Sequence, residues 1–286
     1  MSIKRSLIHI DTPQGQPGFL GRGHVARPVI QRSFAESDPF IMLMDDMLDK
    51  KDHTPVGGPH PHAGFETVSL LIEGEMGEMK AGDLQMMTAG SGVVHTETID
   101  KPTKMRLFQL WLNLPHKDRW APPRLQDILL EHVPDVSNNG VHIRLYSGEL
   151  SGVRSPLQNY TPMILADIRI QPGMTTVQDL PANFNTFLYV LDGTVIIGDE
   201  ATSLDRDQVG WLDIFNSEAT SELKMQAGRE GTRLVLYAGK PTGDAIVSHG
   251  PFIAGSNEDI LSLYKDYREG KMKHISNVDE EQRMML

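Results

Sequence analysis

The 286-residue chain contains no cysteine. This absence excludes disulfide bonds and removes thiolates from the list of available metal ligands. A chain without cysteine fits a reducing compartment, and we expect a cytoplasmic protein.

Long hydrophobic runs are absent as well. No segment approaches 18 consecutive apolar residues, and the N-terminal stretch MSIKRSLIHIDTPQG has no apolar run of the length found in signal peptides. We therefore expect a soluble intracellular protein that does not interact with membranes.

Clusters of positive charge are also missing. Lysine and arginine number 27 against 38 acidic residues, which gives a formal net charge of −11. The densest basic stretches, Lys50–Lys51 and Lys271–Lys273, are short and isolated. Because binding to the phosphates of nucleic acid requires clustered positive charge, direct nucleic-acid binding is disfavoured.

Helical patterns are few. The clearest covers residues 257–269, where Ser256 is a typical N-cap residue, Ile260 begins an apolar stripe and Gly270 is a natural stop. A shorter helix is predicted after Pro122–Pro123, through residues 126–130.

Short apolar runs dominate the chain instead. They have the length of strands, are rich in β-branched and aromatic residues, and are separated by many of the 26 glycines and 18 prolines. The clearest runs cover residues 40–44, 67–72, 106–112, 163–168, 188–191 and 233–237. This pattern predicts an all-β sandwich or barrel.

A weak internal repeat divides these strands into two sets. Residues 71–75 followed by 82–87 have the same pattern as residues 190–194 followed by 207–212: a strand, a turn at an acidic residue and glycine, and a strand after an aspartate turn. The repeat predicts two copies of one β-domain, residues 1–134 and 135–286. Chance is the alternative explanation, since hairpins resemble one another.

Two pairs of polar residues carry the chemistry. His60 and His62 are two residues apart, as are His95 and Glu97, and alternate side chains of a strand face the same side. Two such pairs on neighbouring strands would bring three imidazoles and one carboxylate to a single point. This ligand set suits iron, manganese, nickel, copper or zinc, and open coordination positions would make the site catalytic in type. The alternative for His60 and His62 alone is an exposed turn.

Glu66 shares the parity of both histidines and is a fifth candidate. We interpret it as a residue that orients a ligand imidazole without binding the metal itself.

These residues, with their neighbours, resemble the motifs of the pirin family of the cupin superfamily. The segments that carry the resemblance are residues 38–40, 60–62, 64–68, 82–85, 87–90, 95–97, 109–115 and 250–252. The resemblance implies an all-β fold of two cupin (jelly-roll β-barrel) domains packed together, with a short C-terminal helix.

The same resemblance implies an iron(II) site in the N-terminal domain, with ligands carried over onto His60, His62, His95 and Glu97. It implies a C-terminal domain without metal, and no histidine lies between His142 and His249. Two departures from the family pattern bear on the pocket. Ala63 stands where the family commonly has arginine, and the hairpin of residues 74–83 is shorter than usual.

The family suggests two functions. The first is a dioxygenase that opens a flavonol such as quercetin with O₂, with Glu97 as metal ligand and catalytic residue. The second is a non-catalytic regulator that senses metal or redox state and binds a transcription factor or a metabolic enzyme. The partners would be a small aromatic substrate and O₂ in the first case and a protein in the second. The oligomeric state does not follow from the sequence.

Overall fold

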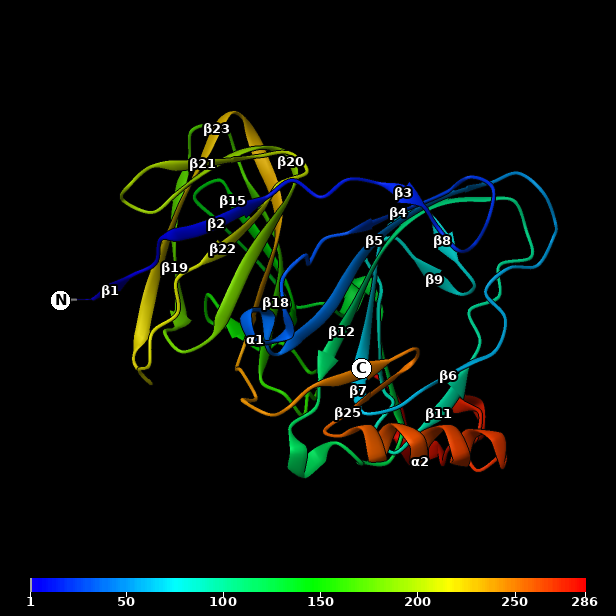
Figure 1. Ribbon diagram of the computed structural model, residues 1–286. Helices are drawn as coiled ribbons and strands as arrows, with labels where there is room; N and C mark the ends of the chain where they lie inside the picture. Colours follow the sequence, from blue (N-terminus) through cyan, green and yellow to red (C-terminus); the bar gives the residue numbers. More distant parts are fainter. Residues whose placement is uncertain (1) are drawn as a thin grey trace. The chain divides into compact units, whose positions relative to one another are not determined.

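A computed structural model describes residues 2–286, and strands dominate it (Figure 1). The all-β fold predicted from the sequence is confirmed. The chain forms two compact units: unit 1 is Met1–Pro13 with Val133–Pro241, and unit 2 is Gln14–His132 with Thr242–Leu286. The first residues of the chain therefore belong with the later half, and the last residues with the earlier half. The division at residues 134 and 135 remains a prediction of domain boundaries.

Unit 2 is built on an eight-stranded sheet. Its strand order is β26-β13-β10-β7-β12-β5-β4-β3. The bounds are β3 Gln16–Pro17, β4 His24–Pro28, β5 Phe40–Lys50, β7 Phe65–Glu73, β10 Leu84–Thr88, β12 Thr103–Asn113, β13 Arg124–Ile128 and β26 Arg283–Met285. Three two-stranded ribbons complete it: β6 His60–His62 with β11 Val93–His95, β8 Glu75–Met76 with β9 Met79–Lys80, and β24 Val247–His249 with β25 Phe252–Ala254.

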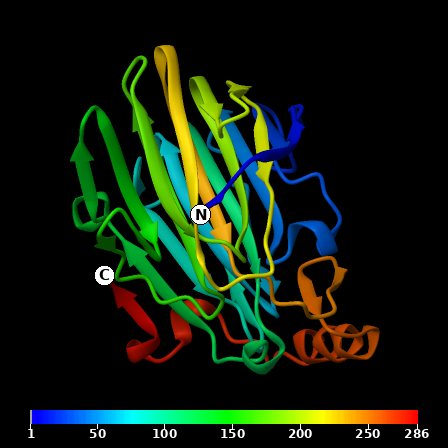
Figure 2. The same cartoon turned by 90° about the vertical axis from the view of Figure 1, so that its left-hand side faces the viewer.

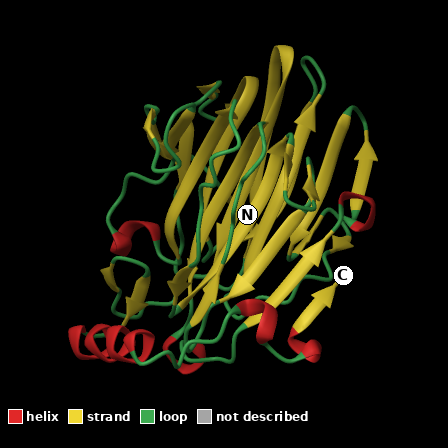
Figure 3. Cartoon of the chain, turned by 90° about the vertical axis from the view of Figure 1, so that its right-hand side faces the viewer, coloured by secondary structure: helices red, strands yellow, loops and turns green. Residues whose placement is uncertain are grey.

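Short helices accompany the strands of unit 2, as the colours of Figure 3 show. They are α1 Phe34–Ser37, η1 His116–Asp118, η2 Leu130–His132, α2 Asn257–Arg268, η3 Ile275–Asn277 and η4 Glu280–Gln282. None of the helices formed by residues 2–286 has the length and hydrophobicity that a membrane span requires.

Unit 1 is built on a ten-stranded sheet whose long strands are visible in Figure 2. Its main path is β14-β15-β18-β23-β20-β22-β2, with β1 and β19 paired to β23 and β21 paired to β20. The bounds are β1 Ile3–Lys4, β2 Leu7–Asp11, β14 Asp135–Asn138, β15 Val141–Ser147, β18 Met163–Ile170, β19 Thr175–Pro181, β20 Asn185–Ile197, β21 Thr202–Asp205, β22 Val209–Leu212 and β23 Thr220–Gly239. A separate two-stranded ribbon pairs β16 Glu149–Leu150 with β17 Val153–Arg154.

The internal repeat has a structural counterpart. The order β10-β7-β12-β5-β4 in unit 2 corresponds to β22-β20-β23-β18-β15 in unit 1. Gly74 and Gly193, the glycines of the two repeats, both have positive φ, at 80° and 68°. A Cβ atom would lie 2.0 Å from the carbonyl oxygen of Lys104 in one case and 2.1 Å from that of Gly231 in the other. Glycine is thus needed at both positions for the same reason.

A buried ion pair repeats in the same way. Arg106 on β12 donates from Nε and Nη2 to Asp45 on β5, at 2.8 Å in both cases. Arg233 on β23 donates from Nη2 to Asp167 on β18, also at 2.8 Å. In each unit the arginine is two residues before the direct cross-strand partner of the aspartate. The two units therefore share register as well as strand order.

The predicted helix at residues 257–269 is confirmed, as α2. The hydroxyl of Ser256 accepts a hydrogen bond from the backbone N–H of Asp259, at 3.1 Å, and so caps the first turn. Ile260 and Leu263 bury the inner side of the helix against a cluster that includes Phe252. Side-chain packing, together with the cap, explains why this 12-residue helix forms.

The predicted helix at residues 126–130 is wrong. Residues Arg124–Ile128 form strand β13, which pairs antiparallel with β10 and parallel with β26. Gln126 and Ile128 are both fully buried while Asp127 between them is not, which is the alternation of a strand. The hydrogen bonds available from two neighbouring strands outweigh the local helical preference.

Candidate metal centre

The ribbon of β6 and β11 carries all three predicted histidine ligands. The two strands are antiparallel, with His60 opposite His95 and His62 opposite Val93. Gly64, which follows β6, has a φ of 87°, and a Cβ there would lie 1.8 Å from the carbonyl oxygen of Ile253. This glycine lets the chain turn from β6 into β7 against the C-terminal segment.

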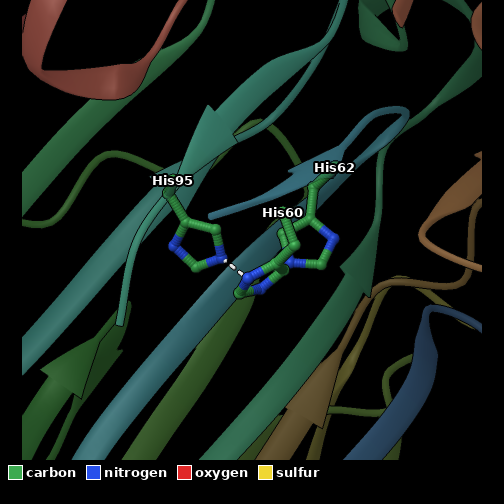
Figure 4. Close-up of side chains that lie close together, drawn as sticks. All are labelled: His60, His62 and His95. Carbon is green, nitrogen blue, oxygen red and sulfur yellow. Dashed lines mark hydrogen bonds between the residues drawn. The ribbon is translucent and has the colours of Figure 1, made fainter. Parts of the chain in front are cut away.

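The three imidazoles converge. One nitrogen from each of His60, His62 and His95 lies within 4.8 Å of the other two, and Nε2 of His95 is 2.8 Å from Nε2 of His60 (Figure 4). Metal–imidazole bonds of about 2.0–2.1 Å would place neighbouring nitrogens about 2.8–3.0 Å apart in an octahedron and about 3.3–3.4 Å apart in a tetrahedron. The observed separation of His60 and His95 is short enough for both rings to bind one ion.

Backbone carbonyls fix the orientation of two of the rings. Nδ1 of His60 donates to the carbonyl oxygen of Gly58 at 2.9 Å, and Nδ1 of His62 donates to that of Pro251 at 3.4 Å. A carbonyl only accepts, so the proton of each neutral ring stays on Nδ1 and Nε2 keeps its lone pair. Such bonds to the remote ring nitrogen are usual for histidines that bind metals.

The two inner histidines are neutral. Burial lowers the pKa of His62 to about 3, with a further contribution from the neighbouring His60. Burial lowers the pKa of His95 to about 2, helped by His62 and His60. A neutral imidazole is the form that binds a metal. The His60 side chain is 32% exposed, so the cluster is accessible from that side.

Glu97, the fourth predicted ligand, lies beside this cluster. Its Oε2 is 4.0 Å from Nε2 of His60, and its Oε1 accepts a hydrogen bond from Nε2 of Gln109 at 3.2 Å. Burial raises the pKa of Glu97, as does the negative charge of Asp46, while His60 and Gln109 act in the opposite direction. A nearby cation would offset the cost of burying this carboxylate. Its assignment as a ligand remains a prediction.

Glu66 is fully buried on β7, the strand that follows β6 along the chain. It accepts a hydrogen bond from the hydroxyl of Thr88 at 2.8 Å and lies 3.7 Å from the guanidinium of Arg124. These contacts tie β7 to β10 and β13. They do not test the role predicted for Glu66, which is to orient a ligand imidazole.

A small cavity opens next to His60 and Glu97. Its volume is about 30 Å³. Its apolar walls come from Phe19, Leu20, Met76, Ile99, Met105 and Leu107, and its polar walls from Asp46, His60, Glu97 and Gln109. Met76 belongs to the shortened hairpin, which therefore does form part of the wall. Ala63, the other departure from the family pattern, is buried in the cluster of Phe252 and Ile260.

Sequence reasoning missed two residues of this cavity, Asp46 and Gln109. Asp46 accepts a hydrogen bond from Nε2 of His24 at 2.8 Å, and both side chains are almost completely buried. The available signal was an acidic pair, Asp45 and Asp46, inside an otherwise apolar strand. Acidic residues on such a strand are rarely buried unless they are paired.

Two cupin-type units, one of them with a histidine cluster, define a bicupin with a candidate centre for a divalent metal. The family model described as Pirin matches residues 23–112, and the model described as Pirin C-terminal cupin domain matches residues 165–273. The chain belongs to the pirin family.

Known relatives agree with this assignment. Human pirin is 33% identical over 260 residues, which cover 86% of this chain and 87% of that protein. A quercetin 2,3-dioxygenase from Acinetobacter baumannii has the same fold, with a TM-score of 0.81 and 24% identity over 95% of this chain and 99% of that one. The Escherichia coli pirin YhhW, solved in complex with nickel(II), aligns with a TM-score of 0.58 and 14% identity over 82% of this chain and 98% of that one.

Proposed function

We propose that this chain is a metal-dependent dioxygenase that binds iron(II) through His60, His62, His95 and Glu97 and acts on a flavonol such as quercetin. The observation that carries the proposal is the convergence of three imidazole nitrogens within 4.8 Å. The quercetin 2,3-dioxygenase of the same fold is the reason for choosing a flavonol as the first substrate to test. Manganese, nickel, copper and zinc suit the same ligands, and the nickel complex of the E. coli pirin makes nickel the first alternative.

Bound iron(II) would supply an open coordination position for a substrate oxygen and electrons for O₂. The chain's own residues prepare the site. The carbonyls of Gly58 and Pro251 accept from Nδ1 of His60 and His62, which leaves the lone pair of each ring on Nε2, and Gln109 donates to one oxygen of Glu97. Apolar side chains form much of the cavity wall, and interactions of charged groups are stronger beside such a wall than in bulk water.

Glu97 serves best as a ligand rather than as a base. A base that takes a proton from the substrate loses the negative charge that holds it to the metal. The hydrogen bond from Gln109 favours the carboxylate form, so it supports the ligand role.

A second candidate function is favoured by the size of the cavity. A volume of about 30 Å³ is far below the several hundred Å³ of pockets that enclose drug-sized ligands. A flavonol has three rings, so most of it would have to remain outside. A regulator that binds metal and a protein partner, such as a transcription factor or a metabolic enzyme, needs no larger pocket.

One experiment separates the two. The protein is loaded anaerobically with iron(II), its metal content is measured, and quercetin is added with and without O₂. Loss of the flavonol absorbance together with equimolar O₂ uptake is expected for the dioxygenase. Stoichiometric iron with no loss of quercetin would reject the flavonol and move the assignment to the regulator.

The location in the cytoplasm is a further prediction, which fractionation of the source cells tests.

A further inference from the structure

The cavity contains a second carboxylate, Asp46, that is not among the predicted metal ligands. We propose that Asp46, positioned by His24, accepts a hydrogen bond from a substrate hydroxyl and so selects substrates that carry a second hydroxyl beside the one that binds the metal. The inference rests on the proposed metal site and adds the class of substrate, an aromatic ring with two adjacent hydroxyl groups.

The tautomer of His24 follows from its contacts. Its Nδ1 accepts a hydrogen bond from the backbone N–H of Leu20 at 3.1 Å, so the proton of the neutral ring is on Nε2. Nε2 then donates to Oδ1 of Asp46 at 2.8 Å. The side chain of His24 is fully buried. Asp46 is therefore held as a hydrogen-bond acceptor in one fixed orientation.

The same histidine fixes the outer wall of the cavity. The ring of Phe19 makes an edge contact with His24, with centroids 5.7 Å apart. Gly18 lies so close to the His24 ring that a Cβ there would be 2.1 Å from Nδ1. One buried side chain thus positions the loop that carries Phe19 and Leu20 together with the carboxylate of Asp46.

Asp46 and Glu97 face the same space. Both line the cavity with His60. A divalent cation with Glu97 would leave one net positive charge in the cavity, which favours an anionic ligand. Asp46 cancels that charge, so the cavity favours a group that keeps its proton and donates it in a hydrogen bond.

The size of the cavity agrees with a single polar group. About 30 Å³ accommodates a hydroxyl and not an aromatic ring. The ring would remain at the outer side, where the side chain of His60 is 32% exposed and Phe19 is 81% exposed. The inner carboxylate is then the part of the site that distinguishes one ring substituent from another.

Two probes that differ by one hydroxyl test this. Nickel(II)-loaded protein is titrated without O₂ with 4-nitrocatechol and with 4-nitrophenol, and both affinities are read from the visible spectrum. We expect Asp46→Asn to lower the preference for 4-nitrocatechol by about tenfold or more, because a hydrogen bond to a charged acceptor is lost. Nickel content is expected to stay unchanged. Asp49→Asn, on the exposed end of the same strand, is the matched control and should keep the preference.

The ratio of the affinities for 4-nitrocatechol and 4-nitrophenol also separates this inference from the proposed function, since the titration involves no turnover. A reduced ratio in Asp46→Asn supports the inference even if no dioxygenase activity is found. An unchanged ratio overturns it even if the iron-loaded protein opens quercetin. Should Asp46→Asn unfold, Asp46→Ser is titrated in the same way, after its thermal unfolding has been compared with that of the unchanged protein.

Discussion

Nε2 of His95 lies 2.8 Å from Nε2 of His60, across two strands whose residues are 35 positions apart. The two nitrogens point to the same place because His60 and His95 are direct partners in an antiparallel ribbon. Cross-strand partners have Cβ atoms only about 4.5–5.5 Å apart. This register is what converts two short sequence motifs into one candidate centre.

The first prediction concerns the histidines. Replacing either His60 or His95 with alanine should lower the affinity for a divalent metal by at least about tenfold, because each would supply one bond to the ion. Metal content after dialysis, measured by mass spectrometry, checks this. His53→Ala removes an exposed histidine near the site in sequence and should leave the metal content unchanged. Equal metal content in all three variants would contradict the assignment.

A second prediction concerns Gln109. Gln109→Leu removes the donor that holds Oε1 of Glu97, so metal affinity should fall by about 10- to 100-fold. Competition with a chromophoric chelator measures the change. Gln31→Leu, which removes an exposed glutamine, is the control. If Gln109→Leu binds metal as tightly as the unchanged protein, then Glu97 does not depend on Gln109 for its position.

The repeated ion pair gives a third prediction. Asp45→Asn leaves Arg106 without its buried charged partner and should destabilise the protein by about 3–5 kcal/mol. Asp167→Asn in unit 1 should act in the same direction through Arg233. Denaturant unfolding measures both. Glu149→Gln, which breaks an exposed pair with Arg154, is expected to change the midpoint little. Similar midpoints for all three variants would show that burial of the pair is unimportant.

A fourth prediction follows from Asp127. Burial raises its pKa, with contributions from the charges of Glu78 and Asp83, while a hydrogen bond from Gln85 opposes them. The folded state therefore binds this proton more tightly than the unfolded state, whose aspartates titrate near pH 3.9. Protonated Asp127 does not lower the stability of the folded state. Ionised Asp127 does, so the protein loses stability as the pH rises through the raised pKa.

Asp127→Asn removes that cost and keeps an acceptor for Gln85. The melting temperature of Asp127→Asn should exceed that of the unchanged protein, and the difference should grow from about pH 4 to about pH 7. The difference should be smallest at the acid end. Asp100→Asn, at an exposed position, is the control. A gain in melting temperature that is largest at low pH would reverse the sign and reject this account.

Much of the fold and part of the site follow from local patterns. Alternation along a strand predicts that His60 and His62 face one side, and the cap at Ser256 predicts where α2 begins. Both features depend on residues a few positions apart. The strand at residues 124–128 was missed because its alternation is short and its partners, β10 and β26, are distant in sequence.

The residues missed at the site depend on register between strands. His24 meets Asp46 only because β4 and β5 pair with Ala26 opposite Asp46, and nothing near either residue in sequence specifies that alignment. The exchange of termini between the two units is equally non-local. Arg5, for example, donates to the carbonyl of Ala182. Such contacts depend on how the whole chain folds, and the spacing of residues along the sequence does not predict them.

The central claim is that three imidazoles of this chain bind one divalent metal ion. X-ray absorption spectroscopy of the iron(II)-loaded protein tests it most directly, because multiple scattering from imidazole rings reports how many histidines bind the ion. The account predicts three imidazoles and a carboxylate oxygen for the unchanged protein, and one imidazole fewer for His95→Ala. A spectrum with only oxygen ligands, or one that is the same in both proteins, would contradict it.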